Sequence, residues 1–291
     1  MSKTISRSEI LSRLHKQTEA GRPILGAGCS SGLVAKCAEL AGADLIIAYS
    51  TGKTRTMGLP TTMITGTSNP MTLEMAPELR NVVKDTPIIA GMEANDIFVL
   101  DLEESIQRFV DAGFSGFINF PTVGLLENLL EGGKDYRVFS EIMAPGYRQD
   151  SWGWKREVEM MRVLNKLDLF TMAYVLSPED AIEMAEAGVD VICAHVGPSM
   201  GGLTGYVSGG VNEMLATGQA IMEAAKSVRS DVICTIHGGP FYDPDSSQVI
   251  YQETDAVGFV AASAIERIPV EQAVMGVCDG YKNLAMPRWE K

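Results

Sequence analysis

The stretch DVICTIHGGP, residues 231–240, is a short apolar run that ends abruptly in His237, two glycines and a proline. A similar stretch, DVICAHVGP at residues 190–198, ends its apolar run in His195. Continuous runs of β-branched residues are typical of strands that are covered on both faces of a parallel sheet. Two of the three histidines of the chain therefore follow predicted buried strands.

Runs of this kind recur along the chain, each closed by a glycine, serine or proline turn and mostly followed by a helical pattern. Eight are present, beginning at Pro23, Asp44, Pro87, Gly116, Leu169, Val191, Val232 and Val257. Eight strands alternating with helices predict an α/β fold, a (β/α)8 TIM barrel with an extra N-terminal helix. The alternative is an open doubly wound sheet, but the first strand runs into LGAGCSSG, whose glycine spacing differs from that of a dinucleotide-binding loop.

The chain of 291 residues has no Pro/Ser-rich linker, so we expect one TIM-barrel domain over residues 1–291, with residues 1–21 as the N-terminal helix. Two insertions interrupt the rhythm of strands and helices, at residues 51–86 and 121–168. Long segments that follow strands lie where barrels build active sites. We therefore expect both insertions at the active-site end.

Composition limits the partners of the protein. A net charge of −13 disfavours nucleic acid and anionic membranes, because both require a positive surface, although a local basic pocket for one small anion remains open. The five cysteines form no C-x-x-C pair, and their odd number argues against a complete disulfide framework. With a polar N-terminus and no long apolar stretch, the sequence predicts a cytoplasmic protein without export or membrane insertion.

The residues just after each apolar run are the candidate catalytic residues. Glu93 directly follows PIIAGM, where a carboxylate would point into the barrel mouth and need a metal, a cation or a bound proton as its partner. His195 and His237 end neighbouring strands, so their imidazoles should lie close together. The alternatives are a capping or surface acid for Glu93 and turn-stabilising roles for the two histidines.

Other residues at these strand ends are candidates for binding substrate. Gly238 and Gly239 would let a ligand approach the backbone. Free amides at Ser263, with Arg267 nearby, would form an anion site after the last strand. The alternative for this region is a solvent-exposed pair of Glu266 and Arg267.

The insertion at residues 50–70 is rich in Gly, Thr and Ser and carries Lys53 and Arg55. It predicts either a mobile lid that brings cations to an anionic substrate or an ordered loop in an oligomer contact. The sequence also predicts a homo-oligomer. The N-terminal helix outside the barrel, the content of 16 methionines and the two long insertions suggest apolar surface that a partner subunit would bury.

Several motifs in combination resemble one protein family. They extend from Arg22 to the end of the chain and read LGAGCSSGLVAKCAELAGADLIIAYSTG, MGLP, IIAGMEANDIF, GFINFPTVGL, AHVGPSMGG, HGGP and GFVAASAIERIPVE. This combination resembles the phosphoenolpyruvate hydrolase-like proteins, a TIM-barrel family related to the phosphoenolpyruvate mutase and isocitrate lyase group. The resemblance implies the same barrel fold.

The resemblance also implies site residues. The wider group holds a carboxylate on a Ser-Gly turn after the second strand, which corresponds here to Ser50 and Gly52. Its Mg²⁺-binding acids after the third strand correspond to the region of Glu93, and the acid after the fourth strand is replaced near Asn119. The implied cofactor is a divalent cation held by Glu93, Mg²⁺ or Mn²⁺ in preference to Zn²⁺.

The expected function is that of a hydrolase or lyase. It would cleave a C–C, C–P or P–O bond of a small keto-acid or enol-type substrate, such as phosphoenolpyruvate or phosphonopyruvate, and its partner would be a small anionic metabolite. The alternative is a non-catalytic barrel that binds a small metabolite or acts in signalling, since fold alone does not decide function.

Overall fold

The computed structural model describes residues 4–60, 66–125, 153–207 and 209–286. Eight parallel strands close into a barrel in sequence order, and β8 pairs with β1. The strands are β1 (Ile24–Gly28), β2 (Leu45–Ala48), β3 (Ile88–Met92), β4 (Gly116–Asn119), β5 (Phe170–Val175), β6 (Val191–His195), β7 (Ile233–His237) and β8 (Gly258–Ala261). The predicted (β/α)8 barrel is confirmed.

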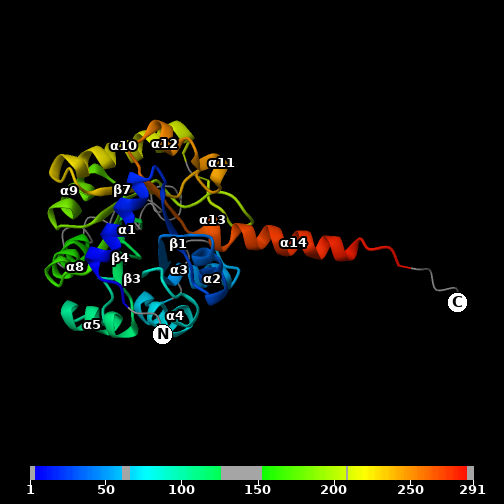
Figure 1. Cartoon of the computed structure of the whole chain (residues 1–291), viewed down its shortest axis with the longest axis horizontal. Coiled ribbons are helices and arrows are strands. Elements are labelled where there is room, and N and C mark those ends of the chain that lie inside the picture. Colours follow the sequence, from blue (N-terminus) through cyan, green and yellow to red (C-terminus); the bar gives the residue numbers. More distant parts are fainter. Residues whose placement is uncertain (1–3, 61–65, 126–152, 208, 287–291) are drawn as a thin grey trace, which may run out of the picture.

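Helices surround the barrel wall and cover its N-terminal end (Figure 1). The described helices are α1 (Arg7–Glu19), α2 (Gly32–Leu40), α3 (Ser50–Thr56), α4 (Ser68–Val82), α5 (Leu102–Ala112), α8 (Trp154–Lys166), α9 (Pro178–Glu186), α10 (Val211–Val228), α11 (Pro244–Ser247), α12 (Ile250–Glu253), α13 (Ser263–Glu266) and α14 (Ile268–Lys282). Local sequence explains their ends. At α9, for example, the Ser177 side chain accepts from the Asp180 amide, and Pro178 occupies the first turn.

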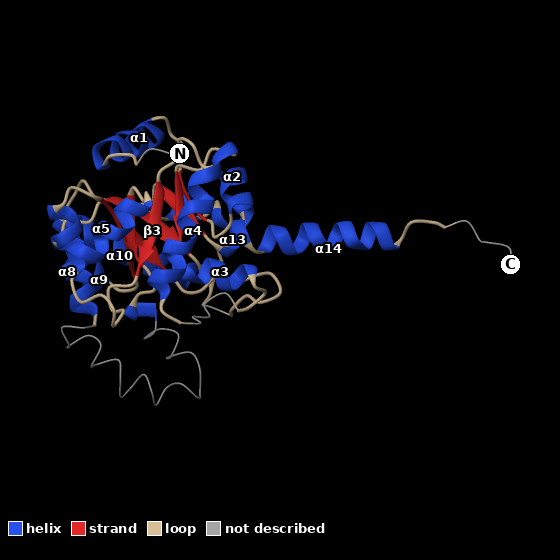
Figure 2. Ribbon diagram, turned by 90° about the horizontal axis from the view of Figure 1, so that it is seen from below, coloured by secondary structure: helices blue, strands red, loops and turns tan. Residues whose placement is uncertain are grey.

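Helix α1 closes the N-terminal end of the barrel, opposite the end at which α3 lies (Figure 2). Its buried Ile10 and Leu14 join the apolar cluster inside the barrel. Its Arg7 forms an ion pair with Asp190, which lies just before β6, with 2.8 Å between Nη2 and Oδ1. This end of the barrel is therefore sealed, and the site lies at the carboxyl ends of the strands.

Glycines inside the barrel make room for the ring of Tyr49, which follows β2. A Cβ added to Gly91 would lie 2.5 Å from Tyr49 Cβ, and one added to Gly28 would lie 2.8 Å from the Tyr49 hydroxyl oxygen. Side chains at these two positions would displace the ring. The glycine residues of β1 and β3 thus allow an aromatic residue to cross the interior just below the mouth.

Helix α14 runs away from the barrel in both views (Figures 1 and 2). Ile268 at its start is its one buried residue. Val270, Val274, Val277 and Tyr281 recur at helical spacing along it and are 48%, 56%, 60% and 72% exposed. One apolar face of a 15-residue helix therefore has no partner within the described part of this chain.

All five cysteines are free thiols. Within the described ranges, no helix is both long enough and apolar enough to span a bilayer.

Candidate active site

A small cavity of about 30 Å³ lies at the carboxyl ends of the strands. Its lining includes Tyr49, Arg55, Phe120, His195, His237 and Ser263. The cavity therefore gathers both strand-end histidines and one strand-end serine that the sequence singled out.

His195 and His237 are direct neighbours across the β6–β7 pair, where their Cα atoms are in register. Their ring centroids lie 4.7 Å apart, with the planes at 61°. The sequence predicted imidazoles close together, and they are. Both are buried, with 4% and 7% of their surface exposed, and both line the same cavity.

Backbone hydrogen bonds assign opposite tautomers to the two rings. The Gly197 amide donates to His195 Nδ1 at 3.2 Å, so a neutral His195 carries its proton on Nε2. His237 Nδ1 lies 2.6 Å from the Val260 carbonyl oxygen, which only accepts, so His237 carries its proton on Nδ1 and leaves a lone pair on Nε2. The pair thus offers one donor and one acceptor.

Burial keeps both imidazoles neutral near pH 7. Burial, with a smaller contribution from His237, holds the pKa of His195 well below its usual range. Burial likewise lowers the pKa of His237 to about 4, against an opposing effect of its bond to Val260. A neutral imidazole with a free Nε2 lone pair can act as a general base.

Aromatic rings support the histidine pair. The ring centroid of Tyr174, at the end of β5, lies 5.1 Å from the centroid of each imidazole ring. The ring centroid of Phe120 lies 5.8 Å from that of Tyr174 and 4.5 Å from that of Tyr49. Burial raises the pKa of both tyrosines, so their phenol groups stay protonated.

Arg55 and Glu266 form an ion pair beside the cavity that is 3% and 0% exposed. Arg55 donates to Glu266 Oε2 from Nη2 at 2.9 Å and from Nε at 3.2 Å, and Ser30 donates to the other carboxylate oxygen. This corrects two expectations. Arg55 lies buried in α3 instead of on a mobile lid, and Glu266 is buried instead of solvent-exposed. Residues 61–65 of the expected lid lie outside the described residues.

Glu93 follows β3 as expected and is half-buried, which raises the pKa of its carboxyl group. Its Oε2 accepts from the Ser68 amide at 3.0 Å, and the Ser50 hydroxyl donates to the Ser68 hydroxyl at 2.8 Å. Asn69 holds the same turn by bonding both the amide and the carbonyl of Glu93. The α4 N-terminus therefore links the expected residues Glu93 and Ser50, although neither lines the cavity.

Three other expected binding residues are engaged within the protein. Gly52 lies in α3, where an added Cβ would come within 2.8 Å of Ser30 Cβ, so it gives room to the Arg55–Glu266 region. Asn119 Nδ2 donates to Glu157 and to the Tyr174 carbonyl oxygen, and Asn119 Oδ1 accepts from the Tyr174 amide. Arg267 donates to Glu271 and to the Gly201 carbonyl oxygen, and is absent from the cavity lining.

Gly238 and Gly239 have a backbone role that the sequence analysis did not predict. Both have positive φ, +87° and +59°. A Cβ on Gly238 would lie 2.0 Å from the Gly197 carbonyl oxygen, and one on Gly239 would lie 2.9 Å from the Val196 carbonyl oxygen. A side chain at Gly238 would therefore meet the protein backbone itself, at a φ that side chains rarely adopt.

Glu157 in α8 was missed by the sequence analysis, because a glutamate in an amphipathic helix gives no signal of burial. Its carboxylate is 0% exposed and accepts from Asn95 Nδ2, Asn119 Nδ2 and the Val123 amide. Burial raises its pKa to about 7. The asparagines at the ends of two adjacent strands were the one available hint.

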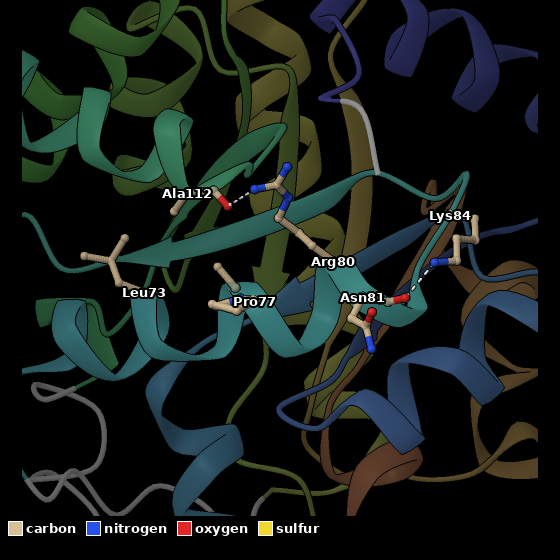
Figure 3. Close-up of a pocket in the computed structure, with 7 residues that line it drawn as sticks. Leu73, Pro77, Arg80, Asn81, Lys84 and Ala112 are labelled. Carbon is tan, nitrogen blue, oxygen red and sulfur yellow. Dashed lines mark hydrogen bonds between the residues drawn. The ribbon is translucent and has the colours of Figure 1, made fainter. Parts of the chain in front are cut away.

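A larger cavity of about 360 Å³ lies on the outer wall between α4 and α5 (Figure 3). It is lined by Leu73, Pro77, Arg80, Lys84 and Ala112, among others. None of the expected site residues lines it. Arg80 crosses it to donate to the Ala112 carbonyl oxygen at 3.1 Å. The expected chemistry therefore belongs to the mouth of the barrel and not to this wall.

The donor set at the mouth constrains any metal. No cluster of three or more His, Cys, Asp or Glu side chains suited to a metal occurs within the described ranges. A four-ligand Zn²⁺ site therefore does not fit these residues. Mg²⁺ commonly uses one or two carboxylates, with water and substrate oxygens completing its shell, so Glu93 alone is compatible with that ion.

Comparison with protein families places the chain. Residues 9–284 match the family described as phosphoenolpyruvate hydrolase-like. The chain belongs to this family. The resemblance seen in the sequence motifs is therefore confirmed over nearly the whole chain.

A curated relative is the "ToMV resistance protein Tm-1(GCR237)" of Solanum lycopersicum, 35% identical over 285 residues. The match covers 96% of this chain and 36% of the relative, so the chain spans about a third of the length of that protein. The "ToMV susceptible protein tm-1(GCR26)" of the same plant matches with the same identity and coverage.

Solved structures share the fold at low identity. A phosphonopyruvate hydrolase in complex with oxalate and Mg²⁺ has a TM-score of 0.58 and 17% identity, over 98% of this chain and 92% of that one. An oxaloacetate acetylhydrolase has a TM-score of 0.59 and 14% identity, over 97% and 90%. The family description names a hydrolase, which supports the expectation of an enzymatic barrel, and these structures share its fold.

Proposed function

We propose that the barrel is a hydrolase or lyase that acts on a small keto-acid or enol-type substrate at the His195–His237 pair. One observation carries the proposal: two adjacent neutral imidazoles line one cavity and present a lone pair and an N–H. Paired acid and base groups of this kind are what a bond cleavage next to a carbonyl group requires. The likeness to hydrolases and lyases of the same fold supports it.

In the proposed reaction, His237 Nε2 takes a proton from an oxygen atom. In a hydrolase this oxygen belongs to water, which adds to a carbonyl carbon of the substrate before the C–C bond at that carbon breaks. In a lyase it belongs to a substrate hydroxyl group, whose C–O single bond becomes a C=O double bond as the C–C bond breaks. The bonding electrons pass to the carbonyl oxygen of the leaving fragment, which becomes an enolate. The His195 Nε2–H donates to this oxygen, and the proton on His237 finally reaches the leaving fragment.

The charge of the lining favours C–C cleavage over C–P or P–O cleavage. Arg55 is the single cation in the lining that the structure describes, and its guanidinium is already bonded to Glu266. A phosphoryl group carries two negative charges that must be balanced on binding. A carbonyl compound with one carboxylate or none needs less compensation, so a small anionic metabolite of this kind fits better.

A divalent cation remains part of the proposal. Glu93, which lies outside the cavity lining, would hold Mg²⁺ or Mn²⁺ together with water, and the ion would supply positive charge beside the cavity. Ser68 and Asn69 fix the turn that carries Glu93, so the carboxylate is oriented whether or not an ion is bound.

We also propose that the protein is a homo-oligomer held by α14. Its apolar face is exposed, and α2 on the barrel wall exposes Leu33 and Leu40 at 75% and 77%. In a (β/α)8 barrel the last helix normally covers the wall beside the first strand. The α14 helix of a second copy can cover this wall, which hides both apolar surfaces at once.

A panel of substrates tests the proposed activity. Purified protein is incubated with 2-keto acids, β-diketones, phosphoenolpyruvate and phosphonopyruvate, each with and without Mg²⁺ or Mn²⁺, and products are followed by NMR. Turnover of carbonyl substrates that is lost in His237→Ala supports the proposal. Release of phosphate alone would contradict the preference for C–C cleavage.

The second candidate is a non-catalytic barrel that senses a metabolite. The small volume of the cavity, about 30 Å³ in the described residues, favours this alternative over an enzyme with a large substrate. The same panel separates the two candidates, since calorimetric binding without any turnover is the result expected for a sensor.

A further inference from the structure

The carboxylate of Glu157 joins three segments at the mouth of the barrel. Its Oε2 accepts from Asn119 Nδ2 at 2.7 Å, and its Oε1 accepts from Asn95 Nδ2 at 3.0 Å and from the Val123 amide at 2.8 Å. These donors come from the end of β4, from the loop after β3 and from the loop after β4. One side chain of α8 therefore links the ends of two neighbouring strands.

The first arm of this network leads to the histidine pair. Asn119 Oδ1 accepts from the Tyr174 amide at 2.8 Å, and Asn119 Nδ2 donates to the Tyr174 carbonyl oxygen at 3.1 Å. The Tyr174 ring then contacts the rings of His195 and His237. Because Glu157 accepts the other hydrogen of Asn119 Nδ2, it fixes the amide orientation that holds Tyr174.

The second arm leads to Glu93. Asn95 lies two residues after Glu93 in the turn that follows β3, and its side chain donates to Glu157. On its other side, the same turn is held by Asn69 of α4. Glu93 is therefore positioned from two helices, α4 and α8.

The chemistry of the network requires a carboxylate at position 157. Its three partners, Asn95 Nδ2, Asn119 Nδ2 and the Val123 amide, are N–H donors, and an ionised carboxylate offers only acceptors. Glutamine would keep the shape of the side chain but would point its own amide hydrogens at donors of the network. Glu157→Gln therefore tests the network with almost no change in volume.

We infer that Glu157 is a positioning residue of the active site, one that holds the Tyr174 ring against the histidine pair and the turn that carries Glu93. The inference rests on the proposed function for its catalytic consequence. The geometric link to the histidines holds independently of any substrate.

Three histidines make the link measurable, because the imidazole NMR signals of His15, His195 and His237 are few and can be assigned by substitution. Spectra are recorded at pH 8, where Glu157 is largely ionised. In Glu157→Gln, the His195 and His237 signals are expected to shift while the signal of His15 on α1 does not. Turnover, where present, is expected to fall about tenfold to a hundredfold, as small misplacements of catalytic groups produce.

Asp190→Asn is the matched control. Asp190 is also a buried carboxylate, 4% exposed, that accepts from Arg7 and the Thr171 amide, but at the opposite end of the barrel. It should lower stability without moving the His195 and His237 signals. If Glu157→Gln does not fold, the shorter Glu157→Asp replaces it and should shift the same two signals.

Two results would overturn the inference: wild-type imidazole signals in the folded Glu157 variant, or equal shifts in Asp190→Asn. Loss of the proposed function has a different signature, which is absence of turnover in the wild type with the Glu157-dependent shifts still present. The two failures are therefore distinguishable.

Discussion

The Arg55 guanidinium and the Glu266 carboxylate meet beside the barrel mouth with 2.9 Å between Nη2 and Oε2, and solvent reaches almost none of either side chain. Arg55 also lies over the Tyr49 ring, with its central carbon 5.3 Å from the ring centroid. Arg55 of α3 and Glu266 of α13, 211 positions apart in sequence, thus form a buried ion pair next to the Tyr49 ring.

Breaking this pair is expected to be costly. In Glu266→Gln the buried guanidinium loses its counter-charge, so the free energy of unfolding should fall by about 3–5 kcal/mol. In the double variant Arg55→Met with Glu266→Gln, the loss should be smaller than the sum of the single losses. Urea denaturation of Glu266→Gln, Arg55→Met and the double variant checks this, and strictly additive losses would show that the two groups do not interact.

The histidine pair gives the main prediction about activity. His237→Ala and His195→Ala should each lower kcat by about 10² to 10⁴, the usual contribution of a general acid or base. His15→Ala on α1 serves as the control and should keep wild-type turnover. Thermal melting is measured on the same samples. A melting temperature that falls in His237→Ala while turnover of the folded protein is unchanged would identify a structural histidine.

Acid is expected to destabilise the fold through His237. Its pKa is about 4 in the folded chain and about 6.5 in the unfolded chain, so the unfolded chain binds more protons between these values. Stability from this group is complete above pH 6.5 and is lost as the pH falls towards 4, by roughly 3 kcal/mol at most. His237→Gln should flatten this part of the curve of unfolding free energy against pH.

Glu157 should act in the opposite direction. Its folded pKa of about 7 lies above the ordinary value of 4.5, so the folded chain holds the proton more tightly. The contribution of Glu157 to the free energy of unfolding is complete below pH 4.5 and is lost as the pH rises through 7. Denaturation curves of Glu157→Gln between pH 5 and 8 should lack this decline, and an unchanged slope would refute the raised pKa.

Gly238→Ala is expected to destabilise the protein directly. A Cβ would meet the Gly197 carbonyl oxygen at a backbone φ of +87°, which side chains rarely adopt. The cost should exceed the roughly 1 kcal/mol of an ordinary Gly→Ala change at a strained position. Gly210→Ala, at a φ of −68° with open space around it, is the control and should change stability little. Equal melting temperatures for the two variants would contradict the backbone role of Gly238.

The α14 face predicts the assembly. Light scattering at micromolar concentration should give a homo-oligomer, and Val274→Asp with Val277→Asp should convert it to monomers, because charge would replace the apolar contact. Leu100→Asp, at a site 83% exposed away from α14, should leave the mass unchanged. A monomeric wild-type protein would remove this proposal.

Sequence alone determined the barrel, because eight buried apolar runs separated by helical patterns have few ways to satisfy their backbone groups. It also determined that His195 and His237 are neighbours, since consecutive strands of a barrel pair in order. Local patterns of this kind depend on residues close together along the chain, and the helix cap at Ser177 belongs to the same class.

Only the tertiary structure decided the surroundings of the histidines. The tautomers depend on Gly197 and Val260, the Arg55 charge is neutralised by a residue 211 positions away, and Glu157 is held by the loops after β3 and β4. Nothing within a few residues of Arg55 or Glu157 distinguishes them from solvated side chains. Burial and pairing are set by which segments the closed barrel brings together, and for this physical reason the sequence could place the site but not its electrostatics.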